Sequence, residues 1–166
     1  MMSSPIARDR MIRIVLLIVL SLGLKTGAAM AAGSSVPVGA EKETLKECSS
    51  CHMAYPPEML PMRSWRKIMG DLANHFGESA ALPEPARADI EAYLMANAGD
   101  TPGAPDGPVF VSDIPADVTP LRVTDTPHWN RLHGEIPASD FASSQVKSKA
   151  NCVACHIMAD QGQYGE

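Results

Sequence analysis

Aromatic side chains are scarce in this chain of 166 residues, at 5% of its composition. Three Phe, two Trp and three Tyr bury too little apolar surface to form the whole core of a domain of this length. Basic residues are also in the minority, and the formal net charge is −5. An acidic surface argues against nucleic acid and anionic membranes as partners, and it allows electrostatic steering toward a basic face of another protein.

Long apolar runs are absent as well, because residues 14–24 fall short of the about 20 apolar residues that a membrane-spanning helix needs. Three arginines precede this run, namely Arg8, Arg10 and Arg13. Small residues through Ala31 follow it. This order is typical of a secretory signal peptide, which we predict over residues 1–31, with a retained membrane anchor as the alternative. Its removal takes away four basic residues and one acidic residue and changes the net charge from −5 to −8.

Cysteine occurs only in two short motifs, which use all four cysteines of the chain. The motifs are Cys48-Ser49-Ser50-Cys51-His52 and Cys152-Val153-Ala154-Cys155-His156. Both read C-x-x-C-H, the signature of covalent c-type haem attachment. Residues three apart share a helix face, so two thiols can reach the two vinyl groups of one porphyrin, and the adjacent histidine can bind the iron.

The sequence therefore predicts two covalently bound haem c groups. Cys48, Cys51, Cys152 and Cys155 are the predicted attachment residues, and His52 and His156 are the predicted proximal ligands of the two irons. Covalent haem attachment in bacteria is completed outside the cytoplasm. Together with the signal peptide, this predicts the periplasm as the location of the protein.

Other chemistries use the same C-x-x-C spacing. A thioredoxin-like dithiol needs a βαβ context, which neither copy has. Zinc ribbons place their two pairs about 15 to 20 residues apart, whereas about 100 residues separate Cys51 from Cys152. A disulfide across two residues would be strained and would leave both following histidines unexplained. Zinc and disulfides remain the alternatives to haem.

The spacing of apolar residues predicts a mostly α fold of short helices with long irregular connections, in which haem forms much of the core. Helices are expected over residues 41–52, 62–76, 86–97, 127–133 and 144–156. Thr126 is the expected cap of the fourth helix, and Gly77 the stop of the second. Prolines should keep residues 109–127 mostly extended and irregular.

A Gly- and Pro-rich segment, residues 99–108, predicts a linker that divides the mature chain. On this interpretation residues 32–98 form a first haem-binding half and residues 109–166 a second. A surface loop is the alternative to a linker.

Three histidines lie outside the motifs, and two are needed to complete both irons. His75 lies at a predicted helix end near the edge of an apolar face, and we favour it as a ligand. His133 lies four residues after Trp129 on the same face, whereas His128 lies in the first turn, where it would face solvent. Methionine competes for the same role, with Met53, Met59, Met62, Met69, Met95 and Met158 in the mature chain. These residues alone leave the iron ligation open.

The order of these features resembles the dihaem cytochrome c family of bacterial electron carriers. The resemblance rests on the first C-x-x-C-H motif, Trp65, His75-Phe76-Gly77, Trp129-x-x-x-His133, Val146-Lys147-Ser148 and Asn151 with the second motif. It covers nearly the whole mature chain. It implies two low-spin, bis-histidine centres in which His75 and His133 are the distal ligands, with His128 the runner-up to His133. It also implies a membrane b-type cytochrome as electron donor and a small oxygen-binding monohaem cytochrome c as acceptor.

The predicted function is therefore electron transfer between a membrane-bound donor and a soluble haem protein, not catalysis on a small-molecule substrate. The alternatives are a dihaem enzyme of the peroxidase or nitrite reductase type and a haem gas sensor, each with one open iron site. No acid-base pair that would serve such an enzyme can be identified in the sequence.

Overall fold

Helices make up nearly all of the regular structure in residues 36–165, the part of the chain that this computed structural model describes. The α-helices are α2 (Ala40–Cys48), α3 (Met62–Met69), α4 (Ala86–Ala96), α5 (Gly107–Val111), α6 (Pro127–His133) and α7 (Ala138–Phe141). Short 3₁₀ segments cover Pro57–Met59, Leu72–Asn74, Val123–Asp125, Cys152–Ala154 and Ala159–Gln161. These described residues contain no strand, and an isolated β-bridge joins His75 to Glu78. The prediction of a mostly α fold with short helices is confirmed.

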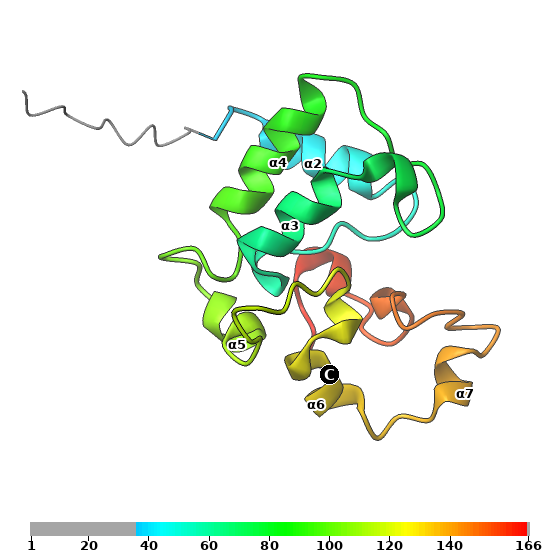
Figure 1. Cartoon of the computed structure of the whole chain (residues 1–166). Coiled ribbons are helices and arrows are strands. Elements are labelled where there is room, and N and C mark those ends of the chain that lie inside the picture. Colours follow the sequence, from blue (N-terminus) through cyan, green and yellow to red (C-terminus); the bar gives the residue numbers. More distant parts are fainter. Residues whose placement is uncertain (1–35, 166) are drawn as a thin grey trace, which may run out of the picture. The chain divides into compact units, whose positions relative to one another are not determined.

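Helix α4 is the centre of the main hydrophobic core, because it packs on both α2 and α3 (Figure 1). The core cluster consists of Leu60, Trp65, Met69, Leu72, Ile90, Leu94 and Ala98. Ile90 and Leu94 are 0% and 2% exposed and lie four residues apart on one face of α4. The helix begins directly after Pro85 and ends before Asn97, so the prediction for this segment is confirmed.

The helix predicted over residues 62–76 is wrong in its second half, because α3 ends at Met69. Gly70 follows, and glycine costs about 1 kcal/mol relative to alanine inside a helix. The chain leaves the helical conformation at Asp71 and forms a short 3₁₀ turn over Leu72–Asn74. Leu72 is buried as expected, whereas Phe76 is 45% exposed and does not continue the apolar face.

Close backbone packing holds the segment after α4 against the first half of the chain. Gly99 donates its N–H to Leu60 O at 3.0 Å. A Cβ at Gly99 would lie 2.6 Å from Val111 Cγ1 and would also collide with Glu58 O, and a Cβ at Gly107 would collide with Gly99 O. Only glycine permits these approaches.

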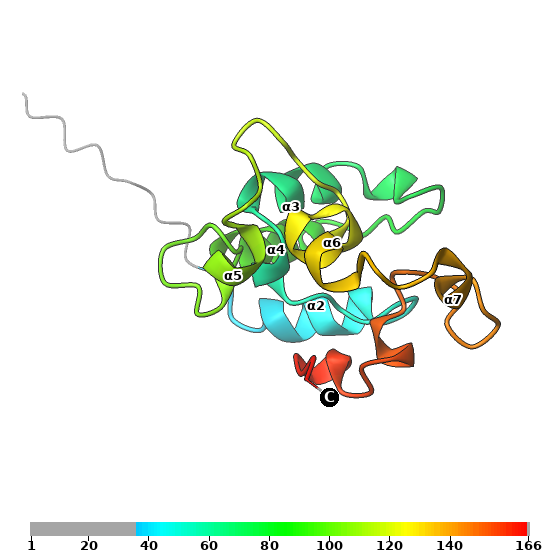
Figure 2. The same cartoon turned by 90° about the horizontal axis from the view of Figure 1, so that it is seen from below.

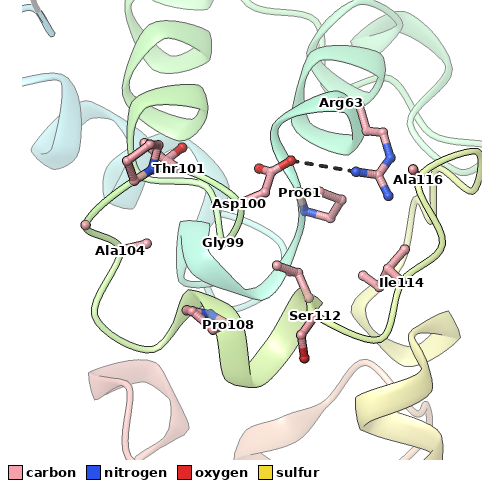
Figure 3. A pocket seen from close by; sticks show the side chains of 13 residues that line it. Pro61, Arg63, Gly99, Asp100, Thr101, Ala104, Pro108, Ser112, Ile114 and Ala116 are labelled. Atoms are coloured by element: carbon pink, nitrogen blue, oxygen red, sulfur yellow. Dashed lines mark ion pairs between the residues drawn. The ribbon is translucent and has the colours of Figure 1, made fainter.

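Arg63 of α3 binds the segment that contains Pro115 and Val118. Its guanidinium donates to Val118 O at 2.7 Å and to Pro115 O at 3.0 Å, and it pairs with the Asp100 carboxylate at 3.6 Å (Figure 3). Asp100 in turn accepts the N–H of Met62 at 2.6 Å. The two charged side chains that line the pocket of about 490 Å³ at this place, Arg63 and Asp100, therefore already pair with each other.

Helix α6 starts as predicted. Pro127 occupies its first position, and Thr126 Oγ1 accepts the N–H of Trp129 at 3.3 Å. The expectation of an irregular course over residues 109–127 is wrong at its start, where α5 runs through Val111. Helix α7 was not predicted.

No helix within residues 36–165 is long and apolar enough to cross a membrane. The predicted signal peptide, residues 1–31, lies outside the described residues. The division into residues 32–98, 99–108 and 109–166 stays a prediction.

Candidate haem-binding sites

The first C-x-x-C-H motif begins at the last residue of α2 and continues in a turn. The predicted helix over residues 41–52 therefore ends early, at Cys48. Ser50 Oγ donates to Glu47 O at 2.8 Å, a local bond that competes with helix continuation. Cys48 is partly buried and Cys51 is exposed. Burial, with a smaller contribution from the Glu47 charge, raises the pKa of the Cys48 thiol.

His52 and His75 face one another across the first site. Their ring centroids lie 6.1 Å apart, with an angle of 23° between the planes. Metal–imidazole bonds of about 2.0–2.1 Å on both sides of one metal ion would separate two ring centroids by about 6.3 Å. The spacing of this pair thus fits a single iron between the rings.

Backbone contacts orient the residues that carry both rings. His52 Nδ1 lies 2.6 Å from Met53 O, so an N–H there leaves Nε2 as the free lone pair. The loop that carries His75 is closed by a bond from its N–H to Glu78 O at 2.7 Å. Burial, followed by the neighbouring His52 and the charge of Arg122, lowers the pKa of His75. Neutral imidazole is the form that binds a metal.

The second motif lies in a 3₁₀ turn, Cys152–Ala154, and not at the end of a long helix. The helix predicted over residues 144–156 is wrong. Side chains take the backbone groups that a helix would use: Asn151 Nδ2 donates to Val146 O at 2.9 Å, and Ser148 Oγ accepts the N–H of Ala150 at 3.0 Å. Lys147 also has a φ of 68°, which ends any regular helix.

His133 and His156 form a second facing pair. Their ring centroids lie 6.0 Å apart, and the planes are 80° from parallel. His133 Nδ1 lies 3.1 Å from Trp129 O, one helical turn earlier, so its Nε2 is left free for a metal. The separation again fits one iron between two imidazoles.

His128, the other candidate for the second site, lies elsewhere. Its ring meets Phe110 edge-on at a centroid distance of 5.2 Å. Its Nδ1 lies 3.3 Å from a guanidinium nitrogen of Arg131. Burial and the Arg131 charge lower the pKa of His128. Of the two histidines of α6, the fold thus brings His133 to the histidine of the second motif.

Exposed apolar side chains lie close in sequence to the residues of both sites. Leu45 and Phe76 lie close in sequence to the first motif and to His75. Leu132 lies beside His133, and Val153 and Ile157 lie in or beside the second motif. The hydroxyl of Tyr164 is buried without a hydrogen-bond partner among the described residues, and its ring lies 6.0 Å from that of His156. A large planar group with an apolar face and polar edges would cover these side chains. The residues present therefore fit haem.

Two of the methionines that could compete as iron ligands are buried in the protein. Met69 belongs to the core cluster, and Met59 is 5% exposed. Both are used in packing, as is usual for this flexible side chain.

Three residues near these sites were not singled out in the sequence. Tyr55 contacts the His52 ring at a centroid distance of 5.3 Å. Arg122 lies over the Phe76 ring at 4.0 Å. Tyr164 is the third. The three-residue spacing of Tyr55 from His52 could have indicated the first contact, whereas no local signal indicates the position of Arg122.

Comparison with known proteins shows which family the chain belongs to. The profile of the family described as dihaem cytochrome c matches residues 44–164, which include both motifs and both facing histidine pairs. The chain belongs to the dihaem cytochrome c family. It therefore holds two haem groups and is a haem electron carrier.

Solved structures of similar proteins support the assignment. The dihaem cytochrome c from Rhodobacter sphaeroides is 43% identical, with a TM-score of 0.65, and the match covers 73% of this chain and 94% of that one. The dihaem cytochrome c from Shewanella baltica is 33% identical, with a TM-score of 0.61, over 76% of this chain and 88% of that one. A comparison with curated proteins found no match.

Proposed function

We propose that this cytochrome attaches two haem c groups covalently and passes electrons through them in the periplasm. Cys48 and Cys51 would bind one haem and Cys152 and Cys155 the other, through thioethers. His52 and His75 would hold the first iron, and His156 and His133 the second. The observation that carries the proposal is the spacing of the two facing pairs, 6.1 Å and 6.0 Å between ring centroids.

Each pair combines one motif histidine with one distant histidine. This arrangement would give each iron two protein ligands and would leave no open position for a substrate, which favours a carrier over an enzyme or gas sensor. When bound, haem supplies an iron that changes oxidation state by one electron. The chain would contribute histidine nitrogens to each iron, and backbone carbonyls beside His52 and His133 would hold the tautomers of these two rings. Apolar side chains would cover the porphyrin.

The direction of electron flow is part of the proposal. The resemblance to the family suggests a membrane b-type cytochrome as donor and a small oxygen-binding monohaem cytochrome c as acceptor. The acidic surface, with a net charge of −8 after removal of residues 1–31, would steer the protein toward basic faces on its partners. A predicted signal peptide supports the periplasmic location.

Spectroscopy of the holoprotein tests the proposal. Both ferric haems should give low-spin electron paramagnetic resonance signals, and the ferrous protein should not bind carbon monoxide. Both haems should stay on the chain in a denaturing gel, because thioethers survive denaturation. Stoichiometric binding of carbon monoxide to the wild-type protein would replace the carrier with the enzyme or sensor alternative.

A further inference from the structure

Tyr55 is the side chain that joins the two candidate haem sites. On one side, its ring lies against that of His52, with a centroid distance of 5.3 Å and an angle of 38° between the planes. On the other side, its hydroxyl donates to Ala150 O at 2.8 Å, a contact between residues 95 positions apart in the chain. One residue therefore contacts His52, the proposed iron ligand of the first site, and the loop that enters the second motif.

The acceptor of this hydrogen bond lies directly beside a haem attachment residue. Cys152 Sγ is 3.8 Å from the same Ala150 oxygen that accepts the Tyr55 hydroxyl. The order of contacts is thus the His52 ring, the Tyr55 ring, the Tyr55 hydroxyl, the Ala150 carbonyl and the Cys152 sulfur. Both ends of this series are atoms that would be bonded to a haem group.

The surroundings keep the phenol in place. Tyr55 is partly buried and packs against the main core cluster. Burial, with a smaller contribution from Cys152, raises the pKa of Tyr55 to about 12, so the hydroxyl remains a donor at neutral pH. The C-terminal segment follows the loop that Tyr55 holds, and Figures 1 and 2 both show it, in red, next to the chain that follows α2.

We propose that Tyr55 is a positioning residue for electron exchange between the two haems, holding the second attachment loop at a fixed distance from the proximal ligand of the first. This inference rests on the proposed function. The short series of contacts would give the electron a packed route between the sites. It would also keep their separation from fluctuating, because the hydrogen bond spans the two halves of the chain.

The test compares three variants of the holoprotein. Tyr55→Phe removes the hydroxyl and keeps the ring, Tyr55→Leu removes both, and Tyr93→Phe is the control. Tyr93 is a partly buried tyrosine of α4 that packs on the same core cluster. Haem content, circular dichroism and low-spin signals identify correctly folded protein for each variant.

Two readouts report on the relationship between the haems. The internal exchange rate after photoreduction of one haem measures electron transfer, and the spin–spin coupling between the two ferric haems depends on their separation. Tyr55→Phe should keep two low-spin haems but exchange electrons severalfold more slowly and with altered coupling. Tyr93→Phe should match the wild type. A Tyr55→Phe protein with the wild-type rate and coupling would overturn this inference and leave the proposed function intact. Carbon monoxide binding by the wild type would instead overturn the proposed function.

Discussion

The imidazole of His133 lies parallel to the indole of Trp129, with the ring centroids 4.6 Å apart and an angle of 8° between the planes. The same helical turn supplies the bond from His133 Nδ1 to Trp129 O. The stack and the bond together fix the plane and the tautomer of the imidazole. In the first site, His75 meets Phe76 edge-on instead, with ring centroids 4.8 Å apart.

Removing the indole of Trp129 should therefore weaken the binding of His133 to the second iron. Trp129 is 7% exposed, so Trp129→Ala should lower the free energy of unfolding by about 3–5 kcal/mol and give part of one haem high-spin character. Denaturant titration and electron paramagnetic resonance measure the two effects, and Trp129→Phe offers a milder variant. Trp65→Ala is the matched control, since Trp65 is also 7% exposed but belongs to the core cluster, which does not include His133. Fully low-spin haem in Trp129→Ala would contradict the role of the stack.

The three histidines outside the motifs should differ in their effect on spin state. His75→Ala and His133→Ala should each convert one haem of the two to a high-spin form that binds carbon monoxide when reduced, because each change opens one axial position. His128→Ala should leave both haems low-spin, since its ring lies against Phe110. Visible and resonance spectra distinguish these results. If His128→Ala alone opened a site, the assignment of His133 would be wrong.

Arg122 should raise the reduction potential of the first haem. Its guanidinium lies 4.0 Å from the centroid of Phe76, which neighbours His75 in sequence, and its positive charge disfavours the more positive ferric iron. Arg122→Gln should lower one of the two potentials by tens of millivolts at low ionic strength, and Arg122→Lys should restore most of the difference. Because the side chain is exposed, salt should reduce the shift. Arg131→Gln, beside His128, is the control, and an equal shift from it would argue against a local effect.

Stability should fall at alkaline pH through Tyr55. Burial raises the pKa of Tyr55 to about 12, above the ordinary value of about 10. A group whose pKa is raised by folding stabilises the fold below its unfolded pKa, and this contribution is lost as pH rises from about 10 through about 12. The wild type should exceed Tyr55→Phe in unfolding free energy at about pH 9 and lose about 1–2 kcal/mol of that difference by about pH 12. A difference that stays constant over this range would contradict the burial of the hydroxyl.

Gly99, which packs closely on the backbone after α4, should tolerate no side chain. Gly99→Ala would bring a Cβ against Glu58 O and within 2.6 Å of Val111 Cγ1. The expected loss is about 1–3 kcal/mol or more of unfolding free energy, because backbone atoms cannot move aside easily. Gly165→Ala is the control, since nothing lies within 4 Å of a Cβ there. Equal denaturation midpoints for the two variants would contradict the close packing.

The sequence by itself determined the features that depend on residues close in the chain. The two C-x-x-C-H motifs place their thiols and histidine within five consecutive residues, so their chemistry is readable without a fold. Helix α4 follows from its apolar period, and the start of α6 from Thr126 and Pro127, because these signals act within one or two turns.

Only the tertiary structure decided which histidines meet. The pairing of His75 with His52 depends on the break after α3 and on the loop closed by Glu78, and neither has a strong local signal. The choice of His133 over His128 depends on where the second motif lies, and side-chain bonds from Asn151 and Ser148 hold that segment in turns, not a helix. Contacts between distant residues decide such cases, because their energies exceed the weak local preferences of single residues.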